Sequence, residues 1–141
     1  MDRTGVSHPA TRVRQEFADF LDDARTCPQY IKRRNYQYIV LPVEIFEALV
    51  PLVVTVKERT DEDGSHFTEN TQFPDVIGFG ETTQEAFDSF KEGLASYSYE
   101  YYDRFSLFSV APGRAEQAPM ILRIISHYER YGNLDEIIKA G

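Results

Sequence analysis

The chain has no tryptophan and a single cysteine, Cys27. One cysteine excludes an intrachain disulfide, so a reducing compartment is expected and the cytoplasm is the predicted location. No N-terminal segment joins basic residues to an apolar stretch as a secretory signal does. The longest apolar stretch, residues 43–56, is interrupted by Glu44, Glu47 and Pro51 and is too short to span a bilayer. These absences exclude a disulfide-stapled secreted scaffold and predict no contact with a membrane.

Residue types that hold metals or perform covalent catalysis are also scarce. His8, His66 and His127 have no Cys or His neighbour at metal-ligand spacing, and Cys27 has no evident base beside it. The acidic turn 61–63 lacks the later oxygen ligands of a calcium loop, so a solvated turn is favoured. We therefore predict no catalytic residue, no metal and no cofactor. An enzyme such as a nuclease is the least favoured class.

What the chain does have is enough apolar mass for a core and an uneven distribution of charge. Its 141 residues are 42% hydrophobic and 13% aromatic, which suits one medium domain or two small ones. The net charge is −8. Up to Leu49 there are seven cations and seven anions, whereas the rest of the chain has eight cations and sixteen anions. The first part can therefore present cations to phosphate, while the second part repels phosphate and suits a basic protein partner.

The first fifty residues predict a helix, a hairpin and a second helix. Residues 7–24 predict one amphipathic helix, because its apolar residues recur at helical spacing: Val13, Phe17, Phe20, Leu21 and Ala24. The β-prone residues 30–31 and 38–41 flank a basic segment, Lys32-Arg33-Arg34-Asn35-Tyr36, and predict a hairpin. Residues 43–50 predict a short helix between two prolines.

A different pattern begins at Leu52. Residues 52–58, 65–73 and 76–79 predict three strands, and Thr82 with Glu85 forms a capping box for a helix over 83–102. Gly78 and Gly80 are interpreted as turn residues before that helix. The helix carries four tyrosines, for which core or dimer packing is favoured over stacking on bases: Tyr97, Tyr99, Tyr101 and Tyr102.

The tail from residue 104 onward predicts a helix over 120–131, ended by Gly132. Asn133, with Glu136 three residues later, predicts the start of a last short helix. The apolar side of the 120–131 helix suits the core, a dimer surface or a docking site for a partner, and the sequence leaves these three open.

The order of the N-terminal segments resembles the Phd/YefM family of antitoxin DNA-binding domains. The matching segments are Arg14-Gln15-Glu16-Phe17-Ala18-Asp19-Phe20-Leu21-Asp22, Tyr30-Ile31-Lys32-Arg33-Arg34-Asn35, Tyr38-Ile39-Val40-Leu41 and Val43-Glu44-Ile45-Phe46-Glu47-Ala48-Leu49. The usual hairpin glycine is Tyr36 here, so the positive φ of the turn is expected at Asn35.

Residues 52–103 resemble HicB, another antitoxin family, which has a partial RNase H-like fold. The matching segments are Asp61-Glu62-Asp63-Gly64, Phe73-Pro74-Asp75-Val76-Ile77-Gly78 and Gly80-Glu81-Thr82-Thr83-Gln84-Glu85-Ala86. Together the resemblances imply an α+β fold in three parts. These are a helix–hairpin–helix module for DNA binding and dimerisation (1–50), a HicB-like three-stranded antiparallel sheet on a long helix (51–103), and a helical tail (104–141).

The resemblance to Phd/YefM implies that Arg14 and Arg33 face operator DNA. Arginine reads guanine edges with two hydrogen bonds, and Arg12, Lys32 and Arg34 are expected on the phosphate backbone. One copy contacts few phosphates, so a homodimer on a palindrome is expected. The implied function is that of an autorepressing antitoxin of a type II toxin–antitoxin system, whose partner is a cognate toxin, a small basic RNase. The alternative is a non-catalytic module that binds a protein or ligand and uses its first part only to dimerise.

Overall fold

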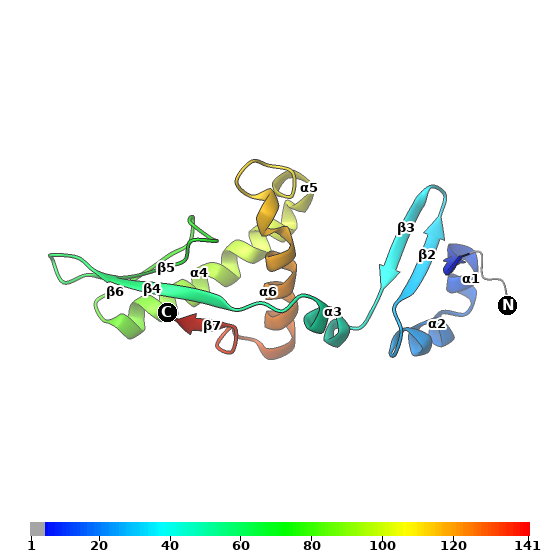
Figure 1. Ribbon diagram of the computed structural model, residues 1–141, viewed down its shortest axis with the longest axis horizontal. Helices are drawn as coiled ribbons and strands as arrows, with labels where there is room; N and C mark the ends of the chain where they lie inside the picture. Colours follow the sequence, from blue (N-terminus) through cyan, green and yellow to red (C-terminus); the bar gives the residue numbers. More distant parts are fainter. Residues whose placement is uncertain (1–4) are drawn as a thin grey trace. The chain divides into compact units, whose positions relative to one another are not determined.

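The computed structural model describes residues 5–141 and divides into two compact units, Met1–Leu49 (unit 1) and Val50–Gly141 (unit 2) (Figure 1). Each unit combines helices with a mixed sheet, so the predicted α+β class is confirmed. Within the described residues, no helix is long and apolar enough to cross a membrane.

Unit 1 has a three-stranded sheet with the strand order β1-β2-β3. Strand β1 runs parallel to β2, and β2 pairs antiparallel with β3. Its elements are β1 (Ser7–Pro9), α1 (Ala10–Gln15), α2 (Phe17–Ala24), β2 (Gln29–Arg33), β3 (Tyr36–Val40) and α3 (Val43–Leu49).

The prediction of one continuous helix over residues 7–24 is wrong in two ways. Residues 7–9 form a strand, held by a hydrogen bond that Gln37 Nε2 donates to Ser7 Oγ (3.0 Å) and by an edge-on contact between the His8 and Phe20 rings. The helix then breaks at Glu16, whose φ and ψ of −119° and 38° are not helical. The helical spacing of the apolar residues is continuous across this break, so the spacing could not predict it.

The hairpin is confirmed, but its turn is not the predicted one. Strands β2 and β3 are joined by two residues, and Arg33 pairs with Tyr36 across the turn. The positive φ lies at Arg34 (57°) and not at Asn35. A non-glycine residue in this region costs about 1–2 kcal/mol, so the turn holds Arg34 in a strained conformation at the tip of the hairpin.

Unit 2 has a four-stranded sheet with the strand order β6-β5-β4-β7. Helix α4 packs along one face of this sheet, and α6 packs on α4 (Figure 1). Its elements are β4 (Val54–Thr60), β5 (His66–Glu69), β6 (Ile77–Gly80), α4 (Thr83–Asp103), α5 (Phe105–Phe108), a 3₁₀ turn (Ala115–Gln117), α6 (Ala118–Tyr131) and β7 (Ile138–Ala140).

The prediction of a three-stranded antiparallel sheet and a purely helical tail is wrong, because the tail supplies β7. Asn133 does not cap a helix; its Oδ1 accepts the Asp135 N–H in a turn (3.0 Å). The chain then pairs parallel with the free edge of β4, where Val54 N donates to Ile137 O (2.7 Å). This arrangement buries Leu134, Ile137 and Ile138. A short terminal helix offers neither these hydrogen bonds nor this burial.

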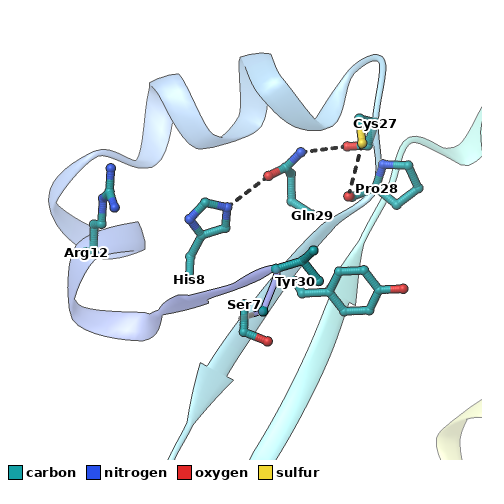
Figure 2. A pocket seen from close by; sticks show the side chains of 9 residues that line it. Ser7, His8, Arg12, Cys27, Pro28, Gln29 and Tyr30 are labelled. Atoms are coloured by element: carbon teal, nitrogen blue, oxygen red, sulfur yellow. Dashed lines mark hydrogen bonds between the residues drawn. The ribbon is translucent and has the colours of Figure 1, made fainter. Parts of the chain in front are cut away.

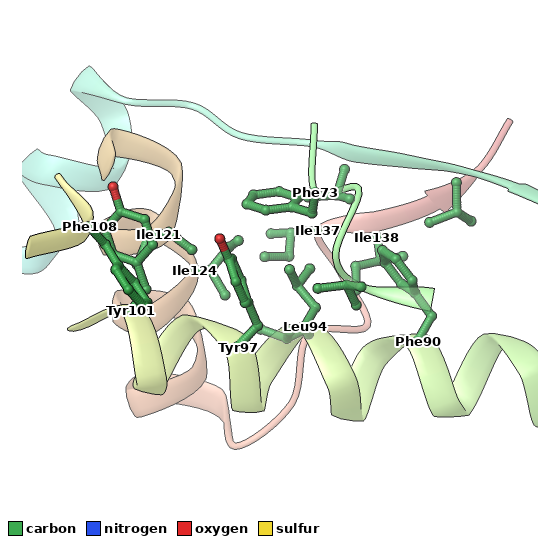
Figure 3. Packing of buried hydrophobic residues seen from close by; sticks show 14 residues of the cluster. Phe73, Phe90, Leu94, Tyr97, Tyr101, Phe108, Ile121, Ile124, Ile137 and Ile138 are labelled. Carbon is green, nitrogen blue, oxygen red and sulfur yellow. The ribbon is translucent and has the colours of Figure 1, made fainter. Parts of the chain in front are cut away.

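The core of unit 2 lies between the sheet and the two long helices (Figure 3). Phe90, Leu94 and Tyr101 from α4 meet Ile121 and Ile124 from α6, and all five are fully buried. The apolar side of α6 is therefore core, which decides one of the alternatives left open by the sequence. The capping box is confirmed, since Glu85 N donates to Thr82 Oγ1 (3.1 Å).

The prediction that Gly78 and Gly80 are turn residues is wrong. Both belong to β6, of which Gly80 is the last residue. A Cβ on Gly78 would overlap the Ala86 carbonyl oxygen of α4 and would lie 2.6 Å from Phe90 N. The glycines are therefore needed for the close approach of helix and strand.

Candidate nucleic-acid interface

The cations of the hairpin lie at its tip and are exposed. Lys32 and Arg33 are the last residues of β2, and Arg34 follows in the turn. Among the described residues, none of these three side chains has an ion-pair or hydrogen-bond partner. A cation without a partner is available to phosphate or to a base edge at no cost of breaking an existing pair.

The register of the sheet brings α1 to the same end as the hairpin tip. Strand β1 runs parallel to β2 and ends with Pro9 opposite Lys32, and α1 begins at the next residue. Arg12 and Arg14 lie on α1, where Arg12 borders a hollow with Cys27 and Gln29 near the start of β2. Arg14 is exposed with no partner in the described part of the chain, whereas Arg12 Nε forms an exposed ion pair with Glu16 (3.2 Å). An exposed i,i+4 pair of this kind contributes about 0.3–0.5 kcal/mol and is easily exchanged for a phosphate.

The alternation of the strand divides the hairpin cations between two faces of the sheet. His8 pairs with Ile31 and contacts Phe20, so α1 and α2 cover the face that carries Ile31 and Arg33. Arg33 therefore points to the same face of the sheet as Ile31. Lys32 stands on the opposite face with Tyr30.

A hollow of about 560 Å³ lies beside Arg12, between the first strand and the start of β2 (Figure 2). His8 Nε2 lies 3.1 Å from Gln29 Oε1, and Gln29 Nε2 donates to the Cys27 carbonyl (3.0 Å). This chain of hydrogen bonds fixes the entry of β2 and gives neither Cys27 nor His8 a catalytic partner. Among the described residues, no group of three His, Cys, Asp or Glu is placed to hold a metal ion.

Unit 1 leaves much of its apolar surface in solvent. Its buried hydrophobic residues are Val13, Phe20 and Ala24. Nine large hydrophobic residues are exposed: Val6, Phe17, Leu21, Tyr30, Tyr36, Tyr38, Ile39, Val43 and Leu49. The predicted single apolar helix face is thus divided, with Phe20 inward and with Phe17 and Leu21 outward. An apolar surface of this extent marks a site of association.

The Asp61 and Asp63 carboxylates of the acidic turn of unit 2 are engaged in contacts with neighbouring residues of the chain. The Asp61 carboxylate pairs with Arg59, and Asp63 Oδ1 accepts the Ser65 N–H (2.9 Å). The hydrogen bond from Ser65 lowers the pKa of Asp63 below its ordinary value. These contacts describe a self-contained turn, as the sequence favoured.

Comparison with known proteins identifies the family. A PHD-like family, described as antitoxins of RelE/RelB toxin–antitoxin systems, matches residues 6–140. The chain belongs to this antitoxin family. It is also similar to a crystal structure described as the antitoxin part of a toxin/antitoxin system from Syntrophomonas wolfei subsp. wolfei. The sequences are 27% identical, the TM-score is 0.79, and the match covers 96% of this chain and 97% of that chain. No curated protein sequence matches the chain.

The match to the antitoxin family is a single one that extends across both units. It confirms the antitoxin part of the prediction and implies a cognate toxin. The finer interpretation, a fusion of a Phd/YefM-like part with a HicB-like part, stays a prediction.

Of the five predicted DNA contacts, Arg12 and Arg14 lie on α1, and Lys32, Arg33 and Arg34 lie at the hairpin tip; all five are exposed. Sequence reasoning missed β1. The segment Ser7–Pro9 is too short to show the alternation that predicts a strand, and Pro9 favoured the start of a helix.

Proposed function

We propose that this antitoxin binds operator DNA as a homodimer and represses its own operon. The observation that carries the proposal is the set of exposed cations of unit 1. Arg14 on α1 and Arg33 at the end of β2 are both exposed and have no partner among the described residues. We assign base contacts to Arg14 and Arg33, and contacts with the phosphate backbone to Arg12, Lys32 and Arg34. Operator binding places the protein in the cytoplasm.

The apolar surface that unit 1 leaves exposed supports the homodimer. A unit of this size that buries three hydrophobic residues and exposes nine large ones gains stability by association. Two copies related by a two-fold axis would present two basic tips to two half-sites of a palindrome.

Unit 2 supports the toxin-binding part of the proposal. Residues 50–141 carry eight cations and sixteen anions, which accounts for the whole net charge of −8. A toxin that degrades RNA must itself attract phosphate, so its surface is basic. Complementary charge would speed the encounter and position the toxin on unit 2.

The experiment is a gel-shift titration of the operon's own promoter DNA with the full chain and with Arg14→Ala/Arg33→Ala. Each lost base contact costs about 1–3 kcal/mol, so the double variant should lose at least roughly tenfold in affinity. Arg25→Ala removes an exposed cation at the end of α2 and serves as the matched control, with binding unchanged. Wild-type binding should weaken steeply with salt. Equal affinity of the double variant and the wild type would contradict the assignment, and no specific affinity at any salt would favour the binding-module alternative.

A further inference from the structure

The sheet of unit 2 has one face that no helix of its unit covers. Helix α4 packs on the face that carries Val54, Val56 and Thr68, all fully buried. Eight strand positions point to the other face: Thr55, Lys57, Arg59, Phe67, Glu69, Ile77, Phe79 and Lys139. We call this surface the outer face.

The register of the sheet aligns these side chains in rows that cross the strands. One row is Arg59, Phe67 and Phe79, from β4, β5 and β6. The Arg59 guanidinium lies over the Phe67 ring, 4.3 Å from its centroid, and the Phe67 and Phe79 centroids are 5.4 Å apart. The row is a continuous surface of three flat groups, and Phe79 remains 56% exposed at its end.

The charge of the outer face is opposite to that of the rest of its unit. Three of its eight positions are cations and one is an anion, in a unit with eight cations and sixteen anions. Lys57 and Lys139 have no ion-pair or hydrogen-bond partner among the described residues. Arg59 is paired with Glu69 (2.9 Å) and Asp61, which hold its guanidinium flat over the ring.

These observations select the chemistry of the occupant. Because Arg59 is already paired with two carboxylates, the unpaired charge of the outer face is that of Lys57 and Lys139. A second copy would add two more charges of the same sign, which opposes self-association. A basic toxin meets the same obstacle. An occupant with negative charge along its length and flat apolar groups between the charges fits both features of the face.

We propose that the outer face of unit 2 binds single-stranded nucleic acid. Bases stack on Phe79 and on the adjacent Phe67–Arg59 pair, and Lys57 and Lys139 contact phosphates. A hollow of about 270 Å³ beside Ile77 and Lys57, with Pro74 and Val76 in its wall, adjoins the row and offers apolar walls to a further base. This site is independent of the operator contacts proposed for unit 1.

The test is fluorescence anisotropy of labelled oligo(U) and oligo(dT) 12-mers titrated with the full chain at low and moderate salt. Phe79→Ala should weaken binding roughly tenfold, since stacking on an aromatic ring contributes about that much per base. Phe79→Trp keeps a ring and should restore binding. Lys57→Gln and Lys139→Gln should each reduce the slope of log affinity against log salt by roughly 0.7. The two oligonucleotides distinguish RNA from DNA as the preferred strand.

Two controls separate this site from the rest of the chain. Tyr102→Ala removes an aromatic side chain of similar exposure, 54%, on α4 beside Asp103, and should leave binding unchanged. Arg14→Ala/Arg33→Ala should also bind the 12-mers normally, whatever its effect on operator DNA. Thermal melts check that each variant is folded.

Three results would overturn the proposal. One is the absence of any anisotropy change with the wild type at low salt. Another is binding that Arg14→Ala/Arg33→Ala removes and Phe79→Ala does not. The third is a Phe79→Ala variant that binds the 12-mers normally and has lost either the co-purified toxin or the wild-type mass in sedimentation, which would assign the outer face to a protein partner or to a second copy.

Discussion

Unit 1 and unit 2 differ in how completely each buries its own hydrophobic residues. Unit 2 buries fifteen hydrophobic residues and exposes seven large ones in 92 residues, whereas unit 1 buries three and exposes nine in the 45 that the structure describes. Unit 2 therefore satisfies its own apolar surface. Unit 1 is a scaffold whose apolar surface suits a partner, and its stability should depend on concentration.

The charges of the two units differ in the same sense. The cations of unit 1 are concentrated on α1 and the hairpin tip, while unit 2 ties several of its cations into carboxylate contacts. Lys91, for example, donates to Asp135 (2.8 Å) and lies 3.2 Å from Asp88, which joins α4 to the turn before β7. The hydrogen bond to Asp135 raises the pKa of Lys91. Unit 2 thus uses Lys91 for its own structure, whereas Arg14 and the hairpin cations of unit 1 have no partner among the described residues.

The largest expected effect on the stability of unit 2 comes from disturbing the close approach of α4 to β6. Gly78→Ala forces a methyl group into the Ala86 carbonyl oxygen, so the free energy of unfolding of unit 2 should fall by about 3 kcal/mol. Chemical denaturation followed by tyrosine fluorescence measures this change. Gly93→Ala in α4 is the matched control, because its Cβ meets only Val76 Cγ1 at 3.3 Å. It should change stability by less than about 1 kcal/mol. Equal effects would show that Gly78 has no packing role.

The second largest expected effect is on the association of two copies through the apolar surface of unit 1. Phe17→Ser/Leu21→Ser removes the outward apolar residues of α2 and should shift the sedimentation mass toward the monomer, together with a lower melting temperature for unit 1. Leu107→Ser/Val110→Ser removes two apolar residues of unit 2 that are more exposed than Phe17 and Leu21, and should leave the mass unchanged. A wild-type chain that is monomeric at micromolar concentration would contradict the homodimer.

The sequence predicted the parts of the fold that rest on local signals. The capping box at Thr82, the glycine end of α6 at Gly132 and the hairpin around Arg33 each depend on a few adjacent residues, and each is present. The α+β class was implied by the two family resemblances.

What the sequence could not predict depends on tertiary pairing. Strands β1 and β7 are three residues long and exist because each pairs parallel with a distant strand, β2 or β4. Residues 133–141 also fitted a short helix, and the free edge of β4 decided between the two. The same limit applies to the candidate site. The basic residues could be recognised in the sequence, but the strand that precedes α1 comes from the pairing of β1 with β2.

The smallest expected effect concerns alkaline pH and unit 2. Burial, reinforced by the hydrogen bond that Tyr99 donates to Glu129 (2.7 Å), raises the pKa of Tyr99 from 10.0 to about 12. Above pH 10 the unfolded chain releases this proton while the folded chain keeps it. The stability that Tyr99 contributes is therefore complete below pH 10 and is lost as the pH rises through 12. Tyr99→Phe should flatten the fall of the melting temperature between pH 10 and 12, whereas Tyr102→Phe, at an exposed position of the same helix, should not. If both variants follow the wild-type curve, the alkaline loss belongs to other tyrosines of the core, such as Tyr97 and Tyr101, whose pKa values burial also raises.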